Sequence, residues 1–119
     1  MADQNAIRAA IQIDGDSSEG FFLCLQPHDM DELTPLFEEE DSYSNGPAWE
    51  GIAEYLINQD PSLEEIELDS EGDALLAYCA RREPLEKLQA ILIEVASDEQ
   101  KLRNLIHDAR EAGFGYGDL

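Results

Sequence analysis

The sequence predicts an α+β fold, in which helices cover one face of a four-stranded, mostly antiparallel sheet in a two-layer domain. Two patterns predict it. Short apolar runs occur in pairs separated by turn-forming residues, which is typical of β-hairpins. Other segments carry apolar residues three and four positions apart, which is typical of amphipathic helices. The expected order is ββαββαα, and the length of 119 residues suits a single domain over residues 1–119.

The first hairpin is expected within residues 7–26. Apolar and more polar residues alternate over residues 7–13, which predicts a half-buried strand. Residues 15–20 are rich in Gly, Ser and acids and are expected to turn. The aromatic-rich run over residues 21–26 is the expected partner strand.

The next expected helix covers residues 47–59. Pro47 suits a first helical turn, because its missing N–H would have no partner there. Residues 28–46 are less regular: we expect a short helical turn broken at Pro35, then an exposed loop over residues 38–46. One face of the helix is expected to be buried through Trp49, Ile52, Ala53, Leu56 and Ile57.

The second half repeats the layout of the first. Residues 63–69 and 74–80 are expected strands, and the second is apolar on both faces, which favours an interior place in the sheet. A helix is expected to open at Pro84, and the pattern S-x-x-Q over residues 97–100 predicts the start of the last helix. Gly113 is the expected C′ residue of that helix, followed by a loose tail or a strap over the core.

Charge is the most unusual feature of the chain. Asp and Glu number 28 against 7 Lys and Arg, which gives a net charge of −21. Residues 9–80 contain 19 acids and no Lys or Arg, whereas residues 81–119 contain six bases and eight acids. Nucleic acids and anionic membranes are therefore excluded as partners, because both bind cationic surfaces. A basic protein is the expected partner.

Three explanations of the charge compete. Acids can serve solubility, they can adapt a protein to high salt, or they can form a directed negative field that attracts a cationic partner. Adaptation to high salt would spread acids over all segments, but the C-terminal third has nearly balanced numbers of acids and bases. We favour the directed field, because like charges repel one another within the folded chain and so a segmental excess needs a reason.

Neither catalysis nor a bound cofactor is expected. The acids are too numerous for any pair to indicate a catalytic site. The segment that starts at Asp14 resembles a calcium loop, but positions six and twelve are Glu19 and Leu25 where Gly and Glu are required, so we expect a turn there, with weak calcium binding left open. Cys24 and Cys79 are expected to be thiols in the core, and the absence of a signal-peptide pattern points to the cytoplasm.

The best candidate interface is the acidic segment with aromatic residues between the first hairpin and the helix at Pro47. An aromatic side chain beside carboxylates suits the capture of Arg and Lys. Trp49 could instead be the first core residue of its helix, and both interpretations stay open. Glu64, Glu65 and Glu67 are the second choice. The candidate partner-binding residues are Glu38, Glu39, Glu40, Asp41, Tyr43, Trp49 and Glu50.

The run Gly46-Pro47-Ala48-Trp49-Glu50, with the helix after it, resembles family 51 of the immunity proteins of bacterial polymorphic toxin systems. The supporting context is the acidic strand over residues 66–71, the strand around Tyr78 and the helix over residues 85–95. The likeness covers residues 20–112 and implies an α+β fold and a protein that binds and neutralises a cognate toxin, often a nuclease.

The residues and the resemblance point to the same function. The first hypothesis is a non-enzymatic immunity protein that blocks a basic toxin, expected to be a nuclease, through its acidic face. The alternative is another acidic interaction module, such as a nucleic-acid mimic that binds a DNA-binding protein. An enzyme with a carboxylate site is the third hypothesis. The oligomeric state is left open.

Overall fold

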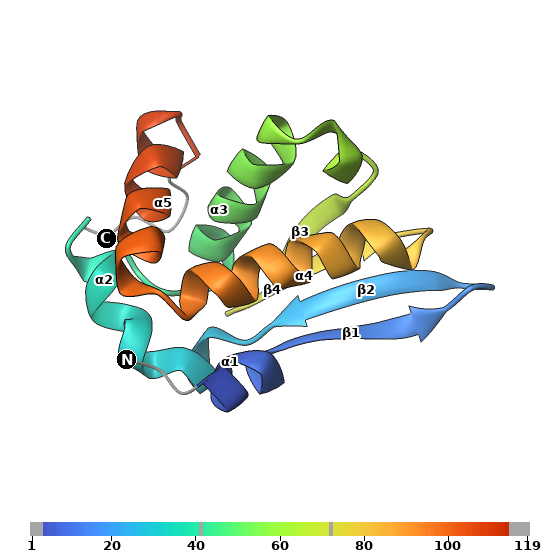
Figure 1. Ribbon diagram of the computed structural model, residues 1–119, viewed down its shortest axis with the longest axis horizontal. Helices are drawn as coiled ribbons and strands as arrows, with labels where there is room; N and C mark the ends of the chain where they lie inside the picture. The colour runs from blue at the N-terminus through green and yellow to red at the C-terminus, as the bar shows by residue number, and fades with distance from the viewer. Residues whose placement is uncertain (1–3, 41, 72, 115–119) are drawn as a thin grey trace.

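The computed structural model describes residues 4–40, 42–71 and 73–114, so the expected tail over residues 115–117 lies outside the described residues. The chain folds as an α+β protein with a four-stranded antiparallel sheet (Figure 1). The elements in order are α1 (Gln4–Ala10), β1 (Ile11–Asp16), β2 (Gly20–Leu25), the 3-10 segment η1 (Pro27–Leu33), α2 (Thr34–Glu38), α3 (Gly46–Gln59), the 3-10 turn η2 (Pro61–Leu63), β3 (Glu67–Glu71), β4 (Ala74–Cys79), α4 (Arg82–Ala96) and α5 (Glu99–Glu111).

The sheet joins two hairpins through their inner strands. Its order is β1-β2-β4-β3, so β2 and β4 are central and β1 and β3 form the edges. The interior place expected for residues 74–80 is therefore confirmed. In the first hairpin, Gly15 has φ +114°, and a Cβ there would lie 2.8 Å from the Cα of Phe21. Only glycine fits this close approach of the two strands.

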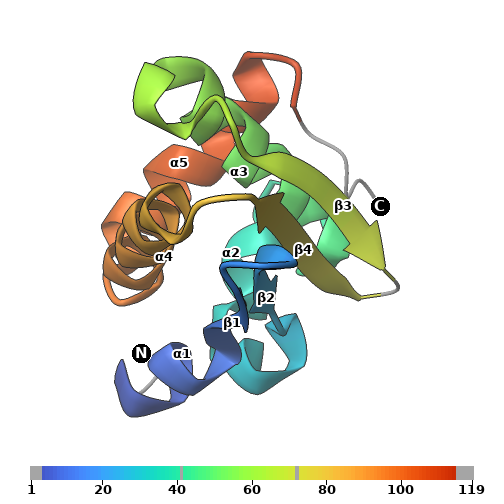
Figure 2. The same ribbon diagram turned by 90° about the vertical axis from the view of Figure 1, so that its right-hand side faces the viewer.

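Helices pack on one face of the sheet, as the sequence predicted. α4 lies across β1, β2 and β4, α3 packs on β3 and β4, and α5 contacts α2, α3 and α4 (Figures 1 and 2). Successive side chains of a strand point to opposite faces of the sheet, so every second side chain points toward these helices. The core residues that the central strands supply are Leu23, Leu25, Leu75, Ala77 and Cys79.

The strand predicted over residues 7–13 is wrong in its first half, where the chain forms α1. The alternation of apolar residues also satisfies helical spacing, since Ile7, Ala10 and Ile11 are the buried ones. Alanines at positions 6, 9 and 10 favour a helix, and α1 packs against η1 and α4. The strand therefore begins at Ile11.

Two further boundaries differ from the prediction. The strand expected over residues 63–69 begins only at Glu67, because Asp60 accepts hydrogen bonds from Ser62 and caps the turn η2. Pro35 does not break a helix but lies in the first turn of α2, where a proline is tolerated.

Both ends of α5 are capped. The N-cap residue is Asp98, one position after the predicted Ser97, and its carboxylate accepts from the backbone N–H groups of Gln100 and Lys101. The predicted C′ residue is confirmed: Gly113 has φ +95°, and the N–H of Phe114 donates to the Ala109 carbonyl over 2.9 Å. This bond closes a Schellman motif.

Candidate functional site

The acidic segment over residues 38–50 connects α2 to α3 and contacts α5. The Arg103 guanidinium donates to both carboxylate oxygens of Glu39 over 3.0 and 3.1 Å. The Nδ1 atom of His107 lies 2.9 Å from a Glu40 carboxylate oxygen. The hydrogen bonds from Arg103 lower the pKa of Glu39, and the Glu40 carboxylate raises the pKa of His107. The last helix therefore offsets part of the charge of this segment.

Trp49 lies in the core. Its side chain has 0% exposed surface, and its ring centroid is 5.2 Å from that of Phe37. The indole N–H donates to the Ser44 hydroxyl over 3.2 Å, so its polar atom also has a partner inside the protein. The sequence left two interpretations open, a core residue and a contact residue. The structure supports the core residue and corrects the other, because a side chain without exposed surface cannot touch a partner unless the core opens.

The remaining candidates of the segment do not converge on one surface point. Glu38 is exposed, and Tyr43 is 54% exposed. Glu50 is half-buried on α3 and, together with Glu54, lines a small hollow against β3. Asp41 lies outside the described residues. The segment thus offers one exposed aromatic ring with part of its acids held in ion pairs.

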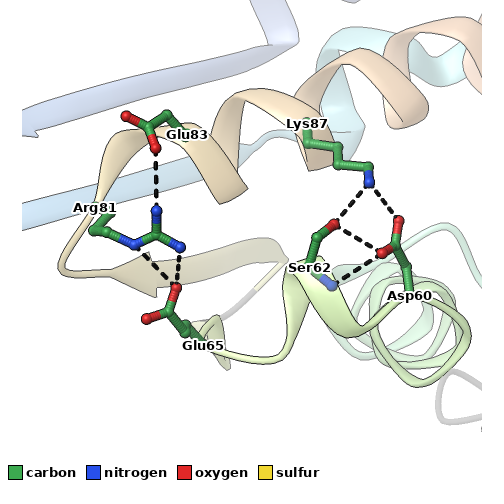
Figure 3. Close-up of polar contacts among 6 residues, drawn as sticks. All are labelled: Asp60, Ser62, Glu65, Arg81, Glu83 and Lys87. Atoms are coloured by element: carbon green, nitrogen blue, oxygen red, sulfur yellow. Dashed lines mark hydrogen bonds and ion pairs between the residues drawn. The ribbon is translucent and has the colours of Figure 1, made fainter.

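Bases at the start of α4 are also engaged within the chain (Figure 3). The Arg81 guanidinium binds the carboxylate of Glu65 and lies 3.1 Å from that of Glu83. The Lys87 ammonium lies 2.7 Å from Asp60 and lowers the pKa of that carboxyl to about 2. Such pairs add little stability in water, and each base offsets the charge of the acid that it contacts.

A different surface, which the sequence reasoning missed, lies on the face of the sheet opposite the helices. The two outward aromatic side chains are those of Phe22 on β2 and Tyr78 on β4, which are directly opposite each other in the ladder. Their ring centroids are 6.2 Å apart, and the residues are 36% and 41% exposed. Cys24 and Leu76 form the next rung of the same face and are half-buried.

Acids occupy the outward positions of the edge strands beside this apolar centre. The register pairs Asp14 with Phe22 on one side and Glu67 with Tyr78 on the other, and it pairs Asp69 with Leu76. All three carboxylates are exposed, and none of them takes part in an ion pair with another described residue. We call Asp14, Phe22, Cys24, Glu67, Asp69, Leu76 and Tyr78 the open sheet face.

A shallow hollow of about 490 Å³ adjoins the open sheet face, next to the turn of the first hairpin. Tyr78 lines it together with the carboxylate-bearing residues Glu19, Glu65 and Glu67. Glu65 is the carboxylate that binds Arg81, whereas Glu19 and Glu67 are in no ion pair within the described part of the chain. Two members of the second-choice set, Glu65 and Glu67, thus lie together at one hollow.

The calcium-like segment forms a turn, as predicted. One carboxylate oxygen of Asp16 accepts from the backbone N–H groups of Ser18 and Glu19 and from the Ser18 hydroxyl, at 2.8 to 3.0 Å. These bonds lower the pKa of Asp16. Across residues 4–40, 42–71 and 73–114, no group of three or more His, Cys, Asp or Glu side chains is placed to hold a metal ion. Cys24 and Cys79 are free thiols; Cys79 is buried in the core as expected, whereas Cys24 is half-buried on the outward face of β2, so its expected core position is wrong.

Fold and surface together define an acidic α+β domain whose sheet is covered by helices on one side and exposes an aromatic pair on the other. The chain belongs to the family described as Immunity protein 51, whose profile matches residues 10–111. Membership suggests an immunity function and implies a toxin as the partner, and immunity proteins are in general not enzymes. No significant match was found among curated proteins or among solved structures. No helix within the described ranges is long and apolar enough to cross a membrane.

Proposed function

We propose that this protein binds a basic protein toxin directly and neutralises it, and that it does so without catalysis and without a cofactor. The observation that carries the proposal is the unbalanced charge of the two hairpins. The edge strands β1 and β3 contain acids, and none of the four described strands contains Lys or Arg. Several of the bases that follow them, Arg81, Lys87, Lys101 and Arg103, are held in ion pairs. Charge of one sign speeds encounter with a partner of opposite sign and excludes partners of like sign.

A nuclease is the kind of toxin that this charge suits best. A nuclease receives phosphates and is therefore basic at its active site. Along β3, Glu67 and Asp69 point outward at every second residue, a spacing of about 6.8 Å. A row of carboxylates with such a spacing can occupy a groove that accepts a phosphate backbone. We expect the encounter to take place in the cytoplasm.

The acidic segment before α3 stays part of the proposal. Glu38 and Tyr43 are exposed and can meet a partner, and Glu50 can do so from its hollow on α3. Glu39 and Glu40 would have to exchange their α5 partners for those of the toxin. The segment is therefore suited to attract a basic partner rather than to hold it, because exposed rim charges affect association rates more than affinity.

We expect a toxin domain to be encoded beside the gene for this chain, and the test is to express that domain with and without the chain. We expect growth to be rescued, a complex to co-purify and the association rate to fall steeply with salt. Loss of nucleic-acid cleavage in the purified complex would support a nuclease. If the toxin still acts in the presence of excess chain, or if the two do not associate at low salt, the proposal is wrong. Capture of a host DNA-binding protein in its place would favour the nucleic-acid mimic.

A further inference from the structure

The open sheet face has an apolar centre that solubility does not explain. An antiparallel sheet covered on one side normally carries polar residues on the side that faces water. Here the outward positions of the two central strands hold Phe22, Cys24, Leu76 and Tyr78. Covering apolar surface is worth about 25 cal/mol per Å², so exposed aromatic rings at the middle of a sheet favour association with another surface.

The charge of the same face is arranged around this centre. Outward positions of the edge strands carry Asp14 on β1 and Glu67 and Asp69 on β3. An apolar centre within a charged rim is the usual anatomy of a protein–protein interface. Aromatic residues at such a centre supply much of the affinity, while the rim keeps water away from them.

The hollow beside Tyr78 adds a site for a single side chain. It combines an aromatic wall with the carboxylates of Glu19 and Glu67, which have no ion-pair partner among the described residues. Arginine suits such a site best, because its planar guanidinium stacks on aromatic rings and donates to two carboxylate oxygens at once. Glu65 also lines the hollow, but its carboxylate is already bound by Arg81.

We propose that the open sheet face is the surface on which the toxin docks. Phe22 and Tyr78 cover an apolar patch of the partner, the acids of β1 and β3 meet Lys and Arg around that patch, and the hollow receives one arginine. The inference rests on the proposed function for the identity of the partner as a toxin. It adds where the partner binds and what chemistry its contact surface must have.

The charge of the face argues against other occupants. A second copy of this chain would bring two acidic rims together, and like charges across an interface disfavour association.

The size of the face indicates how much of the contact it can supply. Four strands about 4.8 Å apart and about five residues long span on the order of 15 by 17 Å. The area of this face is smaller than the roughly 800 Å² that a stable interface uses on each partner. The face is thus the centre of a larger contact.

The first arm of the test uses the toxin that we expect beside the gene, together with two substitutions on the face. We expect Tyr78→Thr, which keeps a good strand former, to weaken binding by about 30-fold, mostly through faster dissociation. Glu67→Lys should slow association by about tenfold at low salt and much less at high salt. The matched control is Asp108→Lys on α5, which is exposed and carries the same change of charge. Thermal unfolding of each variant shows whether it has folded.

Wild-type affinity of Tyr78→Thr, or an equal loss of association rate in Asp108→Lys and Glu67→Lys, would overturn the docking face while leaving toxin binding intact. Strong weakening by Tyr43→Thr with none by Tyr78→Thr would place the interface at the connection before α3 instead. A wild-type chain that binds no toxin would refute the proposed function, and the second arm then decides whether the open sheet face binds a basic, apolar segment.

The second arm needs no toxin. Its probe is a synthetic peptide of alternating arginine and leucine, titrated into the isotope-labelled full chain and followed by backbone amide shifts. We expect the largest shifts at Phe22, Cys24 and Tyr78 and small ones on α5. Shifts confined to residues 38–50, or equal shifts over all acidic segments, would overturn the inference. A concentration-dependent dimer in sedimentation that removes the peptide shifts would assign the face to a second copy.

Discussion

Trp49 is an aromatic residue near acids in sequence, and it could serve either as a partner contact or as part of the core. Its neighbour in sequence is Glu50, and residues 38–41 are all acids, yet its ring packs against Phe37 and is closed to solvent. Its indole N–H donates to the Ser44 hydroxyl, a neighbour within the same protein. Its contribution is therefore to the free energy of unfolding.

Trp49→Ala is expected to lower the free energy of unfolding by about 3–5 kcal/mol, because a large buried ring is replaced by a cavity. Urea denaturation followed by far-UV circular dichroism measures this without relying on tryptophan fluorescence. Tyr43→Ala is the control: its side chain is 54% exposed, and its effect should stay within about 0.5 kcal/mol. A cost for Trp49→Ala no larger than that of the control would contradict the assignment to the core.

His107 links stability to pH through its contact with Glu40. Hydrogen bonding to that carboxylate, and then the charges of Glu40, Glu111 and Asp108, raise the folded pKa of His107 above its usual 6.5. The protonated imidazole therefore stabilises the fold fully below pH 6.5, and this contribution disappears as the pH rises through the raised pKa. His107→Gln should destabilise the protein at pH 5.5 and have much less effect at pH 9.

Thermal unfolding of wild type and His107→Gln at both pH values checks this prediction, and an NMR titration of the imidazole gives the pKa directly. Glu40→Gln removes the first cause of the shift and should bring the pKa of His107 back toward 6.5. An imidazole that titrates at or below 6.5 in the wild type would show that the contact is not formed in solution.

At the scale of elements, the local pattern placed the N-cap of α5 one residue too early. The pattern S-x-x-Q placed the N-cap at Ser97, but the hydroxyl of Ser97 donates backwards to the Ile93 carbonyl of α4. Asp98 is extended at φ −134° and accepts the first N–H groups of α5 instead. Both Ser and Asp are good N-cap residues, so the sequence alone had two adjacent candidates for one position.

Asp98→Ala is expected to cost about 1 kcal/mol of stability, since it leaves two backbone N–H groups of α5 without their acceptor. Ser97→Ala should cost less, because its hydroxyl bonds a carbonyl that already accepts from the Ser97 backbone N–H. Chemical denaturation of the two variants under identical conditions is the measurement. A larger loss for Ser97→Ala would restore the predicted capping box.

The hairpins were predictable as elements because their turns carry strong signals. The aromatic run of β2, the turn of the first hairpin and the apolar run of β4 were all identified from residue type and spacing. The first seven residues of the described chain were not, because Ile7, Ala10 and Ile11 satisfy both a helical and an alternating pattern. Packing of α1 against η1 and α4 decides between them.

At the scale of the whole molecule, net charge opposes folding. A charge of −21 on 119 residues produces self-repulsion that is only partly relieved by the ion pairs of α4 and α5. Whether residues 1–119 unfold as one cooperative unit stays a prediction. The surface charge makes the stability of the fold depend on ionic strength, because salt screens the repulsion between acids.

The midpoint of thermal unfolding should rise when the salt concentration increases from about 0.01 M to about 0.15 M. Over this range the Debye length falls from about 30 to about 8 Å, so repulsion between distant acids is screened more than the ion pairs at contact distance. Calorimetry in sodium chloride, with sucrose at matched osmolality as the control for non-ionic effects, measures the change. A midpoint that falls with salt would mean that the ion pairs outweigh the repulsion.

The sequence by itself determined the α+β class, the hairpins, the acidic character of the chain and its likeness to an immunity protein, because these depend on residue type and on spacing along the chain. Only the tertiary structure decided that Trp49 belongs to the core and that Glu39 and Glu40 face bases of α5. It also brought Phe22 beside Tyr78 and placed acids on either side of them. The physical reason is strand pairing: β2 and β4 are distant in sequence, and which side chains share a face is set by the register between them.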